Sequence, residues 1–110
     1  MAYNGKPFFK IPRPVLLAGG LDVRNISDGI TLTDKDSLFQ VIDSGGSDEN
    51  VILPAEKDGR VYCIQNAGTT NALDVQNNQA VRQVLLGPGD FALLVSSDSQ
   101  WYLIMNQSNL

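Results

Sequence analysis

Clusters of turn-forming residues interrupt the chain at short intervals from Leu21 onward. Asp28-Gly29, the stretch from Ser44 to Ser47 and Asp58-Gly59 are examples, and all contain residues that tolerate a positive φ angle. The clusters recur about every eight to twelve residues, a spacing typical of all-β sandwiches and barrels. Segments this short leave little room for a stable helix. The spacing therefore predicts an all-β chain.

The segments between the turns are expected to be strands, with one short helical turn over residues 34–39 as the sole helical candidate. Alternation marks a buried face, because Leu73 and Val75 point to one side of a strand while Asp74 and Gln76 point to the other. We expect a compact antiparallel sandwich or barrel-like (jelly-roll-like) domain of about eight to nine short strands. The predicted strands cover residues 22–26, 30–33, 38–43, 50–54, 60–66, 71–76, 80–86, 90–96 and 101–105.

The stretch from Leu86 to Met105 carries the clearest strand signal, since a Gly-Pro-Gly turn is followed by two apolar runs separated by a polar loop. The first run, residues 91–95, is apolar on both faces, which predicts a central strand or one whose outer face meets a partner subunit. In the second run, Trp101 and Tyr102 are adjacent and so point to opposite faces. We expect Trp101 to lie inside. The residues expected to share its buried face are Phe91, Leu93, Val95, Leu103 and Met105.

The first 20 residues differ from the rest of the chain. Three prolines disfavour both a helix and a central strand, so residues 1–20 are predicted to be an extended arm, followed by a β domain over residues 21–110. The arm carries three basic and no acidic residues, whereas the remainder carries five basic and twelve acidic residues. Its apolar side chains indicate that it is buried against something, either another molecule or the body of its own domain.

Charge and composition argue against several functional classes. The formal net charge of −4 disfavours a nucleic-acid partner, because phosphate contacts need clustered Lys and Arg. The chain has no histidine, which removes the commonest general base and most transition-metal sites. No Gly-rich stretch is followed by the lysine and helix of a phosphate-binding loop. We therefore expect no catalytic site and no cofactor.

Acidic residues in the loops supply two carboxylate pairs, Asp34 with Asp36 and Asp48 with Glu49. Carboxylates in turns between strands are usually solvated or cap the backbone, so a structural role is expected for both pairs. Asp34, Asp36 and Asp43 are also spaced closely enough to suggest calcium. They lack the ordered ligand series that ends in a bidentate Glu, so no metal site is predicted.

The single cysteine, Cys63, cannot form an intrachain disulfide, and its place in an apolar segment predicts a small buried hydrophobic side chain. No segment has the apolar core of a signal peptide or the length needed to cross a bilayer. We therefore expect synthesis in a reducing cytoplasm and no association with a membrane.

Residues 51–68 read VILPAEKDGRVYCIQNAG and resemble a recurring pattern of tailed-bacteriophage virion proteins. In that pattern a strand ending in Leu-Pro-Ala leads to an acidic glycine turn and then to a strand ending in Asn-x-Gly. The segment Ala72 to Val75, the turn Gly87 to Asp90 and the closing Trp101-Tyr102 are similar to it as well. The resemblance covers roughly residues 38–105 and encodes β architecture without marking an active site.

Within that family the chain is similar in size to capsid decoration, or cement, proteins. The resemblance implies a small β-rich homo-oligomer, a trimer in many cases, that binds the outer surface of the head and stabilises it by bridging major capsid protein subunits. The host cytoplasm would be its place of synthesis and the virion its final location. The residues expected to bind the capsid are Lys6, Phe8, Phe9, Lys10, Ile11 and Arg13, and those expected at the subunit interface are Ala92, Leu94 and Tyr102.

Two other functions are compatible with the same sequence. A tail, baseplate or fibre-associated structural protein shares the pattern but would be present in a few copies per virion. A small carbohydrate-binding module would place Trp101 or Tyr102 on an exposed face.

Overall fold

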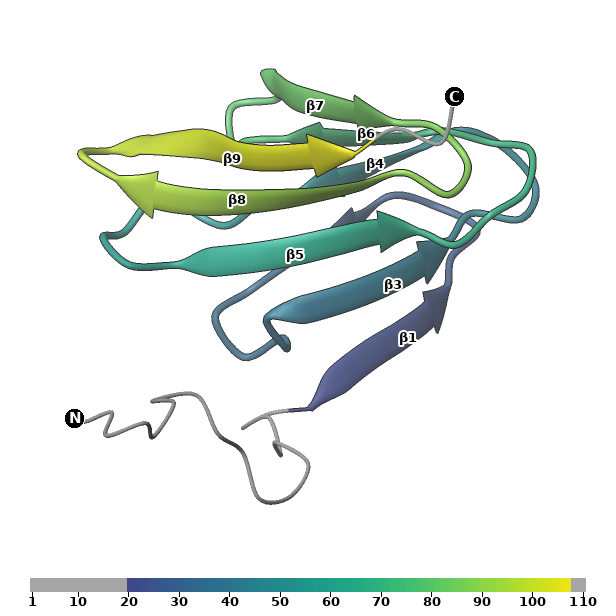
Figure 1. Cartoon of the computed structure of the whole chain (residues 1–110), viewed down its shortest axis with the longest axis horizontal. Coiled ribbons are helices and arrows are strands. Elements are labelled where there is room, and N and C mark those ends of the chain that lie inside the picture. Colours follow the sequence, from purple (N-terminus) through teal and green to yellow (C-terminus); the bar gives the residue numbers. More distant parts are fainter. Residues whose placement is uncertain (1–19, 108–110) are drawn as a thin grey trace, which may run out of the picture.

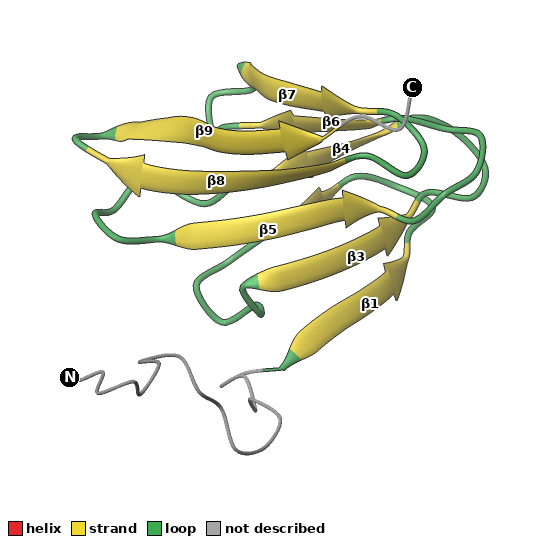
Figure 2. Ribbon diagram, viewed as in Figure 1, coloured by secondary structure: helices red, strands yellow, loops and turns green. Residues whose placement is uncertain are grey.

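The computed structural model describes residues 20–107, in which nine strands form two sheets and no helix occurs. Figures 1 and 2 show the two sheets as the layers of a sandwich. This arrangement confirms the prediction of an all-β chain. The strands are β1 (Leu21–Asn25), β2 (Ile30–Thr31), β3 (Phe39–Asp43), β4 (Glu49–Ile52), β5 (Val61–Asn66), β6 (Leu73–Gln76), β7 (Arg82–Leu86), β8 (Phe91–Ser97) and β9 (Gln100–Gln107).

The first six strands alternate between the two sheets. The five-stranded sheet has the order β1-β3-β5-β8-β9, and the four-stranded sheet has the order β2-β4-β6-β7. Each circuit of the chain thus adds one strand to each sheet, and the four pairings made in this way are parallel. The prediction of an antiparallel sandwich is therefore wrong for this half of the domain, and each sheet as a whole is mixed.

The turns in this half carry the chain from one sheet to the other instead of folding it back on itself. After β1, the Ile26 N–H donates to the carbonyl of Asp43, so the turn continues the pairing with the next circuit. A Cβ added at Gly29 would lie 3.1 Å from the carbonyl oxygen of Asn50 in that circuit. Glycine at this position allows the chain before β2 to lie close against strand β4.

The C-terminal half is antiparallel, through the pairs β6–β7, β5–β8 and β8–β9. The predicted Gly-Pro-Gly turn is confirmed, because Gly89 has a φ angle of 83° and the Gly87 N–H donates to the Asp90 carboxylate. Asp98 and Ser99 both have positive φ angles in the tight turn between β8 and β9. The hairpin predicted from Leu86 to Met105 is therefore present.

The core lies between the two sheets. Trp101 is only 6% exposed, its Nε1–H donates to the Pro54 carbonyl at 3.2 Å, and its ring lies 5.9 Å from that of Tyr62, which confirms its predicted inward position. The remaining buried apolar side chains come from both sheets and their turns: Leu32, Ile42, Val51, Leu53, Tyr62, Ile64, Leu73, Val75, Val84, Leu86, Ala92 and Leu94.

Two predicted interface residues belong to this core. Ala92 and Leu94 are 0% exposed, so their assignment to a subunit interface is wrong. Ser96 pairs with the inward-facing Trp101, and the alternation along β8 then sends Leu94 and Ala92 inward as well. Tyr102 is 43% exposed, and its role at an interface stays a prediction.

The same alternation overturns the buried set proposed around Trp101. Phe91, Leu93 and Val95 face away from the core, and a β-bulge between β8 and β9 pairs Leu93 with Met105, which also lies outside. Leu103 pairs with Leu94 but is 43% exposed on the edge strand β9. The predicted helical turn over residues 34–39 is likewise wrong, since residues 34–35 form a tight turn and β3 begins at Phe39.

Candidate interaction face

The outer face of the five-stranded sheet is apolar across all its strands. The pairing register places Leu21, Phe39, Cys63, Leu93 and Met105 in one continuous row from β1 to β9. A second row beside it runs through Val23, Val41, Gln65, Phe91 and Gln107. A third, shorter row runs through Val61, Val95 and Tyr102 on β5, β8 and β9. We call this surface the apolar face and define it as Leu21, Val23, Phe39, Val41, Val61, Cys63, Phe91, Leu93, Val95, Tyr102 and Met105.

Side chains of the apolar face are accessible in the single chain. Val23 is 73% exposed, Leu21 54% and Met105 52%, while the residues on the middle strands are half-buried against their neighbours. The polar members of the same rows are Gln65 and Gln107, and the three rows contain no charged residue. Three adjacent rows of mainly apolar, uncharged side chains are typical of a site covered by another molecule.

A pocket of about 330 Å³ opens on the apolar face. It is lined by residues of β1, β3, β5 and β8, namely Leu21, Phe39, Gln40, Val41, Cys63, Gln65 and Phe91. Cys63 is half-buried here, so the expectation of a core cysteine is wrong. Burial raises the pKa of its thiol, which keeps the sulfur neutral and poorly nucleophilic at pH 7.

The outer face of the four-stranded sheet is polar by comparison. Asp74 on β6 accepts hydrogen bonds from Arg82 Nε at 2.9 Å and from Gln76 Nε2 at 3.0 Å. The bond from Arg82 holds the pKa of the Asp74 carboxyl below its ordinary value. Asn50 and Thr31 continue this polar surface across β4 and β2. The two sheets share one core but present chemically different outer faces.

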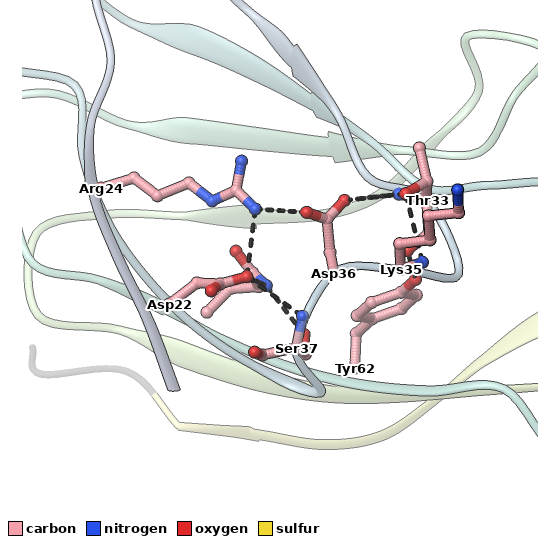
Figure 3. Close-up of polar contacts among 8 residues, drawn as sticks. Asp22, Arg24, Thr33, Lys35, Asp36, Ser37 and Tyr62 are labelled. Carbon is pink, nitrogen blue, oxygen red and sulfur yellow. Dashed lines mark hydrogen bonds and ion pairs between the residues drawn. The ribbon is translucent and has the colours of Figure 1, made fainter. Parts of the chain in front are cut away.

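A polar network on the side of β1 opposite Leu21 and Val23 fixes this edge strand (Figure 3). Arg24 on β1 contacts Asp36 Oδ1 at 2.5 Å and Asp22 Oδ2 at 3.1 Å. Asp22 also accepts hydrogen bonds from Gln40 Nε2 at 2.7 Å and from the Ser37 N–H at 3.0 Å. Strand β1 is thereby tied both to β3 and to the loop before it.

Both carboxylates of this network are held ionised. The hydrogen bond from Gln40, supported by those from Ser37 and Arg24, lowers the pKa of Asp22 to about 2. Burial opposes ionisation of Asp36, but the Thr33 N–H and Arg24 outweigh it and lower the pKa of Asp36 as well. An acid with a depressed pKa is a poor proton donor at neutral pH. The geometry of this network therefore suits a structural role.

Tyr62 extends the network toward the core. Its hydroxyl donates to the Thr33 carbonyl at 2.6 Å, and burial raises the pKa of the phenol. Thr33 in turn donates its N–H to Asp36 at 2.7 Å. The loop that follows β2 is thus bonded to Tyr62 of β5 and closed by a hydrogen bond within the loop itself.

The two members of each carboxylate pair considered from sequence contact different partners. Asp34 is exposed and lies 3.5 Å from Arg60, whereas Asp36 faces Arg24. Asp48 caps the Ala72 N–H at 2.8 Å, and Glu49 accepts from the Ser47 hydroxyl. Within residues 20–107 no group of three or more His, Cys, Asp or Glu residues is placed to hold a metal ion.

The residues predicted to bind a capsid, Lys6 to Arg13, lie outside the described part of the chain. In the described part, no helix is able to span a membrane. The polar network formed by Asp22, Arg24 and Gln40 was not predicted from sequence. A signal was present, because Asp22 and Arg24 alternate with Leu21 and Val23, a pattern that indicates a strand with one polar and one apolar face.

Comparisons of the chain with known protein families, with curated proteins and with solved structures found no match.

Proposed function

We propose that this protein is a structural component of a tailed-phage virion that decorates the outer surface of the head and bridges major capsid protein subunits. The observation that supports this proposal best is the apolar face, which leaves one whole side of a small domain available for association. The resemblance of residues 51–68 to phage virion proteins supplies the biological setting. In this proposal the chain acts by binding and has no catalytic role.

The basic N-terminal segment is the proposed contact with the capsid. Lys6, Lys10 and Arg13 supply positive charge, and Phe8, Phe9 and Ile11 supply apolar anchors. Electrostatic attraction of exposed basic residues weakens as salt is added. When many copies bind one lattice, individually weak contacts add through effective concentration.

Binding to purified heads that lack the protein tests this proposal. In the full-length chain, a Lys6→Glu/Lys10→Glu variant should lose most binding in a co-sedimentation assay, by at least about 10-fold, because two attractive charges become repulsive. A Lys35→Glu/Lys57→Glu variant is the matched control, since it makes the same charge change at two exposed lysines of the domain. Equal binding by both variants would contradict the role of the N-terminal segment.

The number of copies per particle separates the head from the tail. A decoration protein is expected in hundreds of copies, comparable with the major capsid protein, whereas a tail or fibre component is expected in a few copies. Gel densitometry of purified virions measures this ratio. A few copies per particle would replace the head assignment with the tail alternative.

Carbohydrate binding receives less support. Trp101 is buried against Tyr62 and so is not available to stack on a sugar ring. Tyr102 is exposed, but it belongs to the uncharged apolar face. A glycan-array screen with strong hits would reverse this preference.

A further inference from the structure

We infer that the apolar face is covered by the apolar face of a second copy of this chain. The inference rests on the proposed function in one respect, that the protein works by association, and it does not require a capsid. It also replaces the interface expected from sequence, because Ala92 and Leu94 are core residues while their neighbours on β8 face outward.

The composition of the face suits a copy of itself. Residues 21–110 carry five basic and twelve acidic side chains, a net charge of −7, so charged surfaces of two such domains repel one another. The three rows that form the apolar face contain no charged side chain, and Asp43, in the next row beside Asn25, lies at the margin. Two such faces can approach without burying an unpaired charge, which would be costly.

The size of the face is adequate for a self-interface. Five strands spaced about 4.8 Å apart, each contributing about five residues at about 3.3 Å, give a sheet face of roughly 20 by 20 Å. The projected area of this face is roughly 400 Å². Because the side chains project from the sheet, their accessible area is larger than this, toward the ~800 Å² per partner of a standard interface. Two sheets that pack face to face bury their inner side chains in a layer about 10 Å thick.

Contacts at both edge strands of the sheet hold apolar side chains on the apolar face. The network of Arg24 with Asp22 and Asp36 fixes β1, which keeps Leu21 and Val23 directed outward. At the opposite edge, the bulge between β8 and β9 turns Met105 onto the face beside Leu93. Residues from both edges therefore extend the apolar rows beyond the central strands.

Multi-angle light scattering of the full-length protein after size exclusion tests the inference without capsids present. The wild-type chain should have a mass at least twice its 11.9 kDa. Val23→Lys and Met105→Lys, at opposite edges of the face, should each weaken association by at least about 10-fold, because a lysine there must be desolvated. Leu85→Lys is the matched control, since Leu85 is 47% exposed on the outer face of the four-stranded sheet.

Each outcome decides the inference. Dissociation by both face variants, with wild-type circular dichroism spectra and an oligomeric Leu85→Lys control, supports it. A wild-type chain that stays monomeric at about 100 µM overturns it, including the case in which its own N-terminal segment covers the face. An oligomer that both face variants leave intact, or that the control disrupts equally, also overturns it. Failure of capsid binding in the assay above would leave these outcomes unchanged.

Discussion

Replacing Leu94 and its neighbour Leu93 with alanine, one at a time, should give very different losses of stability. The two residues are adjacent on β8, have the same side chain and therefore have the same intrinsic strand preference. Leu94 is 0% exposed between the sheets, whereas Leu93 is half-buried on the apolar face beside Cys63. The comparison thus isolates which face of β8 meets the core.

The expected magnitudes follow from burial. Leu94→Ala removes a fully enclosed side chain and leaves a cavity, which costs about 3 kcal/mol or more of unfolding free energy. Leu93→Ala removes a side chain that is already partly in water and can be refilled by solvent, so its cost in the isolated chain is about 1 kcal/mol. For a small domain whose total stability is on the order of 5–15 kcal/mol, this difference is large.

Urea denaturation followed by tryptophan fluorescence measures both variants. Trp101 is the single tryptophan and is buried beside Tyr62, so its emission reports opening of the core. With a urea dependence of about 1.5 kcal/mol per molar, Leu94→Ala should lower the midpoint by about 2 M and Leu93→Ala by less than 1 M. The measurement is made near 1 µM and repeated at higher concentration, to separate folding from association. Equal shifts, or a larger shift for Leu93→Ala, would refute the orientation of β8.

Two further predictions concern the elements that support the sandwich. Asp22→Asn should lower stability at pH 7 by about 1 kcal/mol after allowance for solvent screening, because the folded pKa of Asp22, about 2, lies below its ordinary 3.8. The ionised carboxylate stabilises the fold above that ordinary value, so the difference between variant and wild type in thermal melts should shrink as the pH falls from 4 to 2; a difference independent of pH would exclude this linkage. Gly29→Ala should cost about 1–3 kcal/mol, because its Cβ would meet the Asn50 carbonyl oxygen, whereas Gly45→Ala, with no atom within 4 Å, should be tolerated far better. Equal melting temperatures for the two glycine variants would argue against the close approach of Gly29 to strand β4.

Local features of the fold were predictable from sequence because they depend on neighbouring residues. The alternation of Leu73 and Val75 with Asp74 and Gln76 is seen on β6, and the Gly-Pro-Gly turn launches the final hairpin. Trp101 was correctly placed inside. Each of these depends on a period of two or on a residue that tolerates a positive φ angle.

Connectivity between strands was not predictable in the same way. A turn such as Asp28-Gly29 permits the chain to reverse within a sheet or to cross to the other sheet, and its residue types do not distinguish the two. In the arrangement observed here, Gly29 lies close to Asn50, which is 21 positions further along the chain. The alternation of strands between sheets, and with it the parallel pairing, follows from such distant contacts.

The apolar face was only partly visible from sequence. The segment 91–95 was recognised as apolar on both sides, but the side that faces the core depends on the pairing of Ser96 with Trp101 across a bulged ladder. A shift of one residue in the pairing register moves every side chain of a strand to the opposite face of the sheet. For this reason Ala92 and Leu94 were assigned outward, while Leu93 and Met105 were assigned inward.

The central claim is that the apolar face is the surface through which this protein associates, and Cys63 reports on it directly. The thiol lies in the middle row of that face between Phe39 and Leu93, and it is the single cysteine of the chain. The rate of its reaction with a maleimide should fall at least about 10-fold as the protein concentration is raised through the association range, and Val23→Lys should abolish this protection. A rate that is the same at every concentration, in a protein shown to be oligomeric, would contradict the claim.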